Sequence, residues 1–345
     1  MEYDAFVLLS FGGPEKPDDV MPFLRNVVRG RGVPEARLLT VAEHYMHFGG
    51  VSPINEQCRR LLAAVESEFS AHGLAFPAYW GNRNWQPMLE DTVAQMRDDG
   101  VTHALGFATS AYGGYSSCGQ YWEDIARARA FVGPRAPLVT KLRQFHDHPG
   151  FVGPHVSAVQ AALSELSGDR RETTRIVFTA HSVPVSMAET AGPHGGRYTA
   201  QLNETAALVH AGAAPGLAWD LVWQSRSGPP QVPWLEPDVN DHLRVLADKG
   251  VTDVVISPIG FVSDHLEVVW DLDNEAAETA RSLGLGYARA ATPGTDPRFV
   301  TMVRELVEER TAGRARARLG TLPVWDDCPG GCCPTPRRPA ATRPS

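Results

Sequence analysis

Short apolar runs alternate with longer stretches of helical periodicity along most of this sequence. The runs AFVLLSF, ALGFATS, RIVFTA, LAWDLVW and DVVISPIGF have the length and composition of buried strands. The stretches MLEDTVAQMRDDG and DVNDHLRVLADKG have the spacing of amphipathic helices. Strands separated by helices form parallel sheets, because each crossover needs a helix that covers the sheet. The alternation therefore predicts an α/β fold with buried parallel strands.

The two parts of the chain resemble each other. Residues 96–115 and 246–265 share a helix end, a glycine stop, a Val-Thr pair and an apolar strand, and the strand before each ends in Arg83 or Arg226. Any two βαβ units look alike, and that alternative stays open. The similarity favours two Rossmann-like halves, residues 1–148 and 149–312, with a C-terminal helix packing back and a tail at 313–345. Ligands in such folds bind beyond the carboxyl ends of the strands, here in a cleft between the halves.

Composition narrows the class of protein. The chain has 345 residues, 43% of them hydrophobic, which suits a globular protein with two cores. No run of eighteen apolar residues and no signal peptide occurs, so we expect a cytoplasmic protein without an integral membrane segment. The net charge of -8 disfavours nucleic acid as a partner. We also expect a monomer.

Aromatic residues gather where the predicted strands end. SFGGPE after the first strand lacks the GxGxxG pattern, and no GxxxxGK[ST] motif occurs, which disfavours a nucleotide site. A large, flat, apolar ligand suits this distribution, although aromatic side chains scattered through a core would look the same. The aromatic residues in or near these loops are Phe11, Tyr45, Phe48, Tyr112, Tyr115, Tyr121, Trp234 and Phe261.

The stretch SDHLEVVWDLDNE carries acids at Glu267, Asp271 and Glu275, four residues apart. On a helix they form one negative stripe, which costs roughly 0.2–0.5 kcal/mol per pair. His181, after the strand in FTAHSVP, would face Glu267 if both loops border one cleft. An imidazole facing a carboxylate can bind a divalent metal or transfer protons. A capping histidine and a solvated acidic helix face are the alternatives.

Six motifs resemble successive signatures of the ferrochelatases: LLSFGGPE, FGGVSPIN, GNRNW, FTAHSVP, WQSRSGPPQVPWLEP and PIGFVSDHLEVVWDLD, spanning about residues 3–300. The actinobacterial branch is most similar. The resemblance implies a chelatase-like fold and insertion of ferrous iron into coproporphyrin III, giving coproheme in haem biosynthesis. A non-catalytic haem or porphyrin carrier, and a chelatase for protoporphyrin IX or sirohydrochlorin, remain alternatives.

The resemblance also implies roles for individual residues. The metal-inserting histidine falls on His181 and its partner glutamate on Glu267, with Asp271 and Glu275 as a possible path for iron. Ser52 and Tyr121 would hold the porphyrin propionates. Related firmicute enzymes have a tyrosine where this chain has Phe11, so axial oxygen ligation is not expected there. The remaining implied pocket residues are Arg83, Trp234, Tyr45, Tyr112 and Phe261.

Three of the five cysteines crowd into CPGGCC, as Cys328, Cys332 and Cys333. Their thiolates can wrap a small inorganic centre. The resemblance implies a two-iron, two-sulfur (2Fe-2S) cluster whose fourth ligand is Cys118, although animal relatives space their terminal cysteines more widely. A zinc site or free thiols are the alternatives. Cys58 lies in a helical run and is expected to be a buried side chain. From about residue 312 onward we expect a linker and a disordered end.

Overall fold

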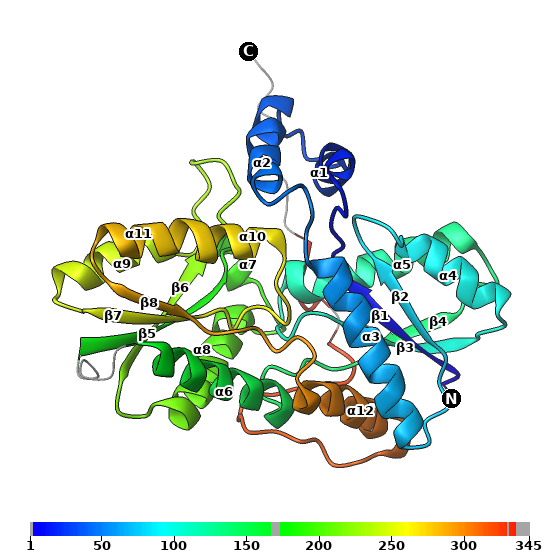
Figure 1. The fold of residues 1–345 in the computed structure, drawn as a ribbon. Helices are drawn as coiled ribbons and strands as arrows, with labels where there is room; N and C mark the ends of the chain where they lie inside the picture. Colours follow the sequence, from blue (N-terminus) through cyan, green and yellow to red (C-terminus); the bar gives the residue numbers. More distant parts are fainter. Residues whose placement is uncertain (1–2, 167–172, 330, 336–345) are drawn as a thin grey trace.

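Two four-stranded parallel sheets form the body of the protein, which a computed structural model describes for residues 3–166, 173–329 and 331–335 (Figure 1). The predicted α/β fold is confirmed. The first sheet has the order β2-β1-β3-β4, and the second has the order β6-β5-β7-β8. The strands are β1 (Ala5–Ser10), β2 (Ala78–Asn82), β3 (His103–Ala108), β4 (Leu138–Lys141), β5 (Thr174–His181), β6 (Ala218–Gln224), β7 (Asp253–Ser257) and β8 (Gly286–Arg289).

The internal similarity of the sequence corresponds to equivalent elements. Residues 96–115 contain the end of α4 and strand β3, whereas residues 246–265 contain the end of α9 and strand β7. In the order of strands across each sheet, β3 and β7 are both third. Strands β2 and β6, which precede Arg83 and Arg226 in the sequence, are both first. The chain passes from one sheet to the other between β4 and β5, which brackets the predicted boundary at residue 148.

Helices cover both faces of each sheet, as crossovers between parallel strands require (Figure 1). In the first half they are η1 (Pro17–Asp19), α1 (Val20–Val27), α2 (Glu35–His47), α3 (Ile54–Ala71), α4 (Leu89–Asp98), η2 (Tyr115–Gly119) and α5 (Gln120–Val132). After β4 they are α6 (Pro149–Glu165), α7 (Val185–Glu189), α8 (Arg197–Ala213), α9 (Val239–Asp248), α10 (Leu266–Val268), η4 (Val269–Ala276), α11 (Ala277–Ser282) and α12 (Pro297–Ala312). None of the described helices is long and apolar enough to cross a membrane.

One buried apolar cluster joins the two halves. The ring of Phe107 in β3 lies 5.0 Å from that of Phe145 and 6.1 Å from that of Phe299 in α12. Helix α12 packs on α3 from the first half and on α6 from the second. The same cluster includes Phe178 of β5. The two sheets therefore share a core.

Helices α1 and α2 stand above both sheets (Figure 1). They enclose a separate small apolar cluster that includes Phe23, Leu24 and Leu38. The ring of His44 in α2 stacks on Trp270 in η4 at 3.9 Å with an interplanar angle of 5°. This stack joins the raised pair of helices to the second half.

The segment after α12 is attached to the body although its described residues form no helix or strand. Arg318 Nε lies 2.7 Å from Asp147 Oδ2, and the Thr321 N–H donates to Glu204 Oε1 at 2.7 Å. A linker was expected here, but residues 313–329 are docked. The predicted disordered end, from 336 onward, lies outside the described residues.

Candidate functional site

His181 is the last residue of β5, so its side chain emerges at the carboxyl end of the second sheet. Its Nδ1 lies 2.5 Å from the Ser182 carbonyl oxygen, which can only accept a hydrogen bond. This contact assigns a proton to Nδ1 and directs Nε2 outward. Nε2 lies 3.7 Å from Glu267 Oε2. The two loops therefore meet, as the sequence predicts.

The charges of His181 and Glu267 depend on each other. Burial of the imidazole opposes protonation, but the Glu267 carboxylate outweighs it and raises the pKa of His181. Burial would raise the pKa of Glu267, yet the His181 contact lowers it. Both side chains keep a partly exposed surface, 34% for His181 and 44% for Glu267. The two side chains thus favour each other's charged forms, and a cation arriving from solvent can reach both.

Asp271 lies one turn beyond Glu267 and is buried. It accepts hydrogen bonds from Gln224 Nε2, at 3.1 Å, and from Ser225 Oγ. Burial and then the charge of Glu267 raise the pKa of Asp271 to about 7. Glu275 ends the row at an exposed position. The three acids run from the histidine to the surface.

The backbone beneath this row is wider than an α-helix. In η4 the hydrogen bonds span five residues, and the Ala277 N–H donates to the Leu272 carbonyl. Such widened turns are rare and often occur at functional sites. The three acids therefore lie on helical backbone, as their spacing predicts. The π geometry of that helix was not predicted.

A second group lies at the carboxyl end of the first sheet. The Arg83 guanidinium lies 5.9 Å from the Phe11 ring centroid and 4.5 Å from that of Tyr121. Arg83 Nε also contacts Asp124 Oδ2 at 2.5 Å, and both side chains are buried. Asp124 thereby neutralises the charge of Arg83. The group formed by Phe11, Tyr121 and Arg83 therefore carries no net positive charge.

The other predicted pocket residues differ in their placement. Ser52 is buried and its Oγ accepts the Leu266 N–H at 3.4 Å, beside the histidine site. Phe261 packs edge-on against His265 at 5.2 Å. Tyr45 is near Glu267: burial, and then the Glu267 charge, raises its pKa.

Trp234 and Tyr112 lie in different surroundings. Trp234 is half-buried, and its Nε1 has no hydrogen-bond partner among the described residues. Tyr112 is 1% exposed and its hydroxyl donates to the Ile259 carbonyl at 2.7 Å. Tyr112 thus lies in the shared core and presents no surface to a ligand in this structure.

Two residues near His181, Gln224 and Ser225, were absent from the predicted site. Gln224 pairs with His181 in the register of β5 and β6, and Ser225 follows it. Their signal was available, because WQS ends the strand adjacent to the histidine strand. His265 precedes α10, and burial lowers its pKa. Its uncharged ring leaves Glu267 to interact chiefly with His181.

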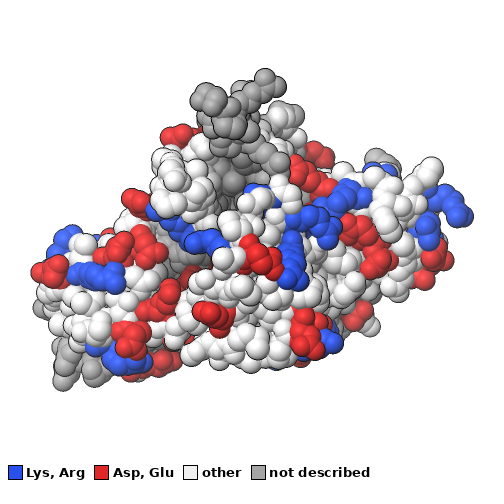
Figure 2. Space-filling model, turned by 90° about the horizontal axis from the view of Figure 1, so that it is seen from above, with Lys and Arg blue, Asp and Glu red and all other residues white. Residues whose placement is uncertain are grey.

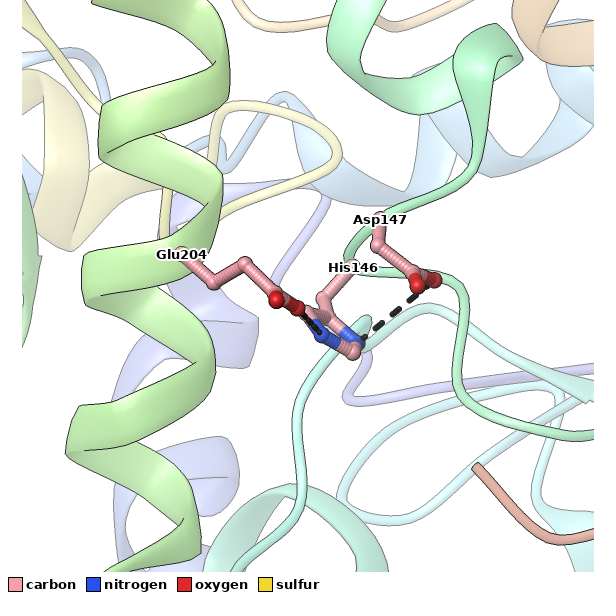
Figure 3. Close-up of side chains that lie close together, drawn as sticks. All are labelled: His146, Asp147 and Glu204. Atoms are coloured by element: carbon pink, nitrogen blue, oxygen red, sulfur yellow. Dashed lines mark hydrogen bonds and ion pairs between the residues drawn. The ribbon is translucent and has the colours of Figure 1, made fainter. Parts of the chain in front are cut away.

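A further group of possible metal ligands consists of His146 and Asp147, between β4 and α6, and Glu204 in α8 (Figure 3). One ligand atom from each lies within 4.8 Å of the others. These side chains already have partners: His146 Nε2 contacts Glu204 at 2.9 Å, and Arg318 holds Asp147. The group therefore anchors the tail, and we assign it no metal.

Cys118 lies close to the three tail cysteines, Cys328, Cys332 and Cys333, although about 210 residues separate them in the sequence. Cys332 and Cys333 have their sulfurs 3.7 Å apart, and the Gly192 N–H donates to Cys333 Sγ at 3.2 Å. A hydrogen bond from Cys328 is the largest influence holding the pKa of Cys118, in η2, well below its usual range. Cys58 is elsewhere, buried in α3 with its sulfur 3.2 Å from Ser10 Oγ.

Charged side chains of both signs alternate over the described part of the face seen from above (Figure 2). Basic side chains do not merge into one continuous surface on that face.

The sequence of this chain is similar to those of several known proteins. A model of the ferrochelatase family matches residues 3–311. A coproporphyrin III ferrochelatase of Nocardia farcinica is 59% identical over 351 residues and covers 99% of each chain. One from Mycolicibacterium vanbaalenii is 54% identical, covering 97% of this chain and 99% of the relative. One from Streptomyces griseus is 52% identical, covering 96% and 93%.

Among solved structures, SirB from Bacillus subtilis with Fe3+ has a TM-score of 0.54 at 14% identity, covering 90% of this chain and 98% of that chain. At this identity the likeness shows the fold alone.

Proposed function

This chain belongs to the ferrochelatase family, and from that premise we propose that it inserts ferrous iron into coproporphyrin III to form coproheme in haem biosynthesis. Three relatives of that name match nearly its whole length at 52–59% identity. The observation that carries the mechanism is the 3.7 Å contact between His181 Nε2 and Glu267.

Insertion requires two changes at the porphyrin centre, because iron enters while two pyrrole protons leave. With its proton on Nδ1, His181 offers the Nε2 lone pair either to a pyrrole proton or to iron. Glu267 stabilises the protonated imidazole that results. An arriving dication repels the imidazolium and replaces it as the counter-charge of Glu267, so iron binding favours release of the proton from His181.

The acid row suits delivery of iron better than storage. Hard carboxylate oxygens bind ferrous iron only moderately. Asp271, with its pKa raised to about 7, is close to half ionised at neutral pH and so attracts the cation less than a full charge would. We place Glu275 at the outer end of this path, because it is exposed.

The porphyrin itself would lie between the two groups of pocket residues. We assign propionate contacts to Ser52 and Tyr121, and ring contacts to Phe11, Tyr45 and Phe261. Arg83, Trp234 and Tyr112 complete the proposed set. Because Tyr112 is buried here, its contact with substrate requires the halves to separate locally.

The test is an anaerobic absorbance assay with purified protein, ferrous iron and each porphyrin in turn. Coproporphyrin III should be metallated faster than protoporphyrin IX, and His181→Ala should abolish the reaction. Binding of coproporphyrin without a spectral change on adding iron would indicate a carrier. Faster metallation of sirohydrochlorin would contradict the proposed substrate.

We further propose that Cys118, Cys328, Cys332 and Cys333 hold a 2Fe-2S cluster. Four free thiols, two buried and two partly buried, converge there and fit its ligand set. The cluster would join η2 of the first half to the tail. Iron insertion involves no net redox change, so this structural role suits it better than electron transfer to substrate.

Colour gives a direct test of the cluster. Freshly purified protein should be brown, and Cys118→Ser should bleach it and lower its stability. Cys58→Ser is the matched control and should change neither property. Colourless, iron-free protein of full stability would contradict the proposal.

We also propose a cytoplasmic location, because all five cysteines are free thiols and such thiols suit a reducing compartment. The monomeric state remains a prediction, which size-exclusion chromatography with light scattering would check.

A further inference from the structure

Two buried cations flank the four cysteines. Lys141, the last residue of β4, is 7% exposed, and Arg197, the first residue of α8, is 8% exposed. Within the described residues, neither forms an ion pair with a carboxylate. A buried charge is costly unless an opposite charge compensates it. These two cations therefore require a negative partner of another kind.

The contacts of Arg197 are all with neutral groups. Its Nε donates to Gln144 Oε1 at 3.0 Å, its NH2 group donates to the Pro323 carbonyl at 2.7 Å, and its guanidinium lies 4.4 Å from the Trp325 ring centroid. These contacts orient the guanidinium without neutralising it. The charge is thus available to the cysteine site.

Lys141 and Gln144 approach the cysteines from the first half. The Lys141 ammonium lies 5.7 Å from the Trp122 ring centroid, and Lys141 lines the same small cavity as Arg197 and Cys328. Gln144 Nε2 is buried and has no hydrogen-bond partner among the described residues, and Gln144 lines this cavity too. A buried ammonium and an unsatisfied amide N–H beside the cysteines indicate a strongly negative centre there.

The backbone is shaped to admit Arg197. A Cβ added to Gly113 would lie 2.7 Å from Arg197 Cδ, and one added to Gly192 would lie 2.6 Å from Arg197 Cβ. Gly192 also has a φ of +81°, which favours glycine, and its N–H donates to Cys333. The loop that makes room for the arginine therefore also binds a cysteine sulfur.

Charge counting connects these observations. An oxidised two-iron, two-sulfide core held by four thiolates carries two negative charges, and reduction adds a third. Resting on the cluster proposed above, we propose that Lys141 and Arg197 are the counter-charges of this centre, which retain it and set its reduction potential. Loss of one cation disfavours the more negative, reduced state, so the potential must fall.

The test is a redox titration of the full-length protein, followed by absorbance and electron paramagnetic resonance. Lys141→Met should shift the reduced-to-oxidised ratio about tenfold toward oxidised, which is about 59 mV for one electron. Lys249→Met is the matched control, because Lys249 is exposed at the end of α9 and the change in net charge is the same. A shift no larger than that of the control overturns the proposal.

Variants that lose the cluster remain informative. If Lys141→Met folds by circular dichroism but lacks the cluster, while Lys141→Arg retains it, the charge is responsible and the proposal stands. If both variants lack it, the charge is not the cause and the proposal fails. Arg197→Gln should lower the potential further in the Lys141→Met background.

A separate arm distinguishes failure of this proposal from failure of the cluster. If wild type holds no cluster, apoprotein is titrated with Co2+, whose sulfur charge-transfer absorption reports thiolate ligation. Lys141→Met should weaken that binding at least tenfold, and Lys249→Met should not. Equal affinity in the two variants would overturn the counter-charge role, whatever centre the thiolates hold.

Discussion

The charge coupling between His181 and Glu267 predicts how insertion depends on pH. Glu267 raises the pKa of His181, and iron can bind Nε2 only when it is unprotonated. Insertion should therefore rise with pH through the His181 pKa. In Glu267→Gln that rise should move to lower pH, because the neutral amide no longer stabilises the imidazolium.

The same variant should insert iron about 10²–10⁴-fold more slowly, the usual range for a lost acid-base partner. Rates measured anaerobically from pH 5 to 9 supply both quantities. Glu278→Gln, an exposed glutamate on α11, is the control and should match wild type. An unchanged rate and pH profile in Glu267→Gln would remove the pair from the mechanism.

Asp271 should destabilise the fold when it is ionised. Its folded pKa of about 7 lies above the ordinary value of 3.8, so the folded state binds more protons than the unfolded state between these pH values. Stability from this residue is lost as pH rises from about 4 to 7. Asp271→Asn should thus be more stable than wild type at pH 8, by about 1–2 kcal/mol, and slower in insertion.

Urea unfolding at pH 5 and pH 8 measures this effect, and the advantage of Asp271→Asn should shrink at the lower pH. Asp241→Asn, at a 75% exposed side chain, should show no such dependence. A variant less stable than wild type at pH 8 would mean that the hydrogen bonds of Asp271 outweigh its charge.

At the residue scale, the sequence predicts the site correctly where the functional side chains come directly after strands. His181 and Glu267 could be paired because the carboxyl ends of parallel strands lie at one edge. The neutralisation of Arg83 by Asp124 could not be predicted, since it depends on how α5 packs beside β2. Tyr112 was expected at a pocket wall, yet its side chain is buried in the shared core, where its hydroxyl donates to the Ile259 carbonyl.

At the scale of elements, the docked segment 313–329 depends on Glu204. This carboxylate accepts the N–H groups of Thr321 and Leu322. Burial would raise its pKa, but His146 and these N–H groups lower it to about 2. Its stabilising effect is therefore present above the ordinary pKa of 4.5 and is lost as pH falls toward 2.

Glu204→Gln should lower the free energy of unfolding by about 2 kcal/mol at pH 7 and release the segment. Limited trypsin digestion should then cut after Arg314, Arg316 or Arg318, which wild type should resist. Glu278→Gln is again the exposed control. Equal resistance in Glu204→Gln would show that the remaining contacts suffice to hold the segment.

The strands and most helices follow from periodicity, but this docked segment does not. Its residues are rich in arginine and form no regular element, which is typical of a linker. Its partners lie more than a hundred positions earlier in the chain, at Asp147 and Glu204. No local pattern carries information about such contacts. The π geometry of η4 was missed for a similar reason, since spacing by four suits α and π helices alike.

For the whole molecule, the tail should divide into a required and a dispensable part. A chain ending at residue 336 should keep the cluster colour, the melting temperature and iron insertion. A chain ending at Ala312 should lose the colour and melt at lower temperature, because it lacks the docked segment and three cysteines. Loss of folding in the longer chain would contradict the sequence prediction of a disordered end.

The shared core predicts that both halves unfold together. Phe299 in α12 is fully buried and contacts Phe107 of the first sheet and Phe151 of α6. Phe299→Ala should cost about 3–5 kcal/mol, because it leaves a cavity where the halves meet. Unfolding in urea should remain one transition, with circular dichroism and tryptophan fluorescence coincident.

Phe131→Ala provides the matched control for that shared core, since the Phe131 side chain is 70% exposed and the chemical change is identical. It should alter stability by no more than about 0.5 kcal/mol. If the two sheets had independent cores, Phe299→Ala would separate the curve into two steps, with only one half shifted to lower urea. A single unfolding transition, shifted to lower urea, would mean that neither sheet is stable without the other. We therefore expect that fragment 1–148 alone does not fold.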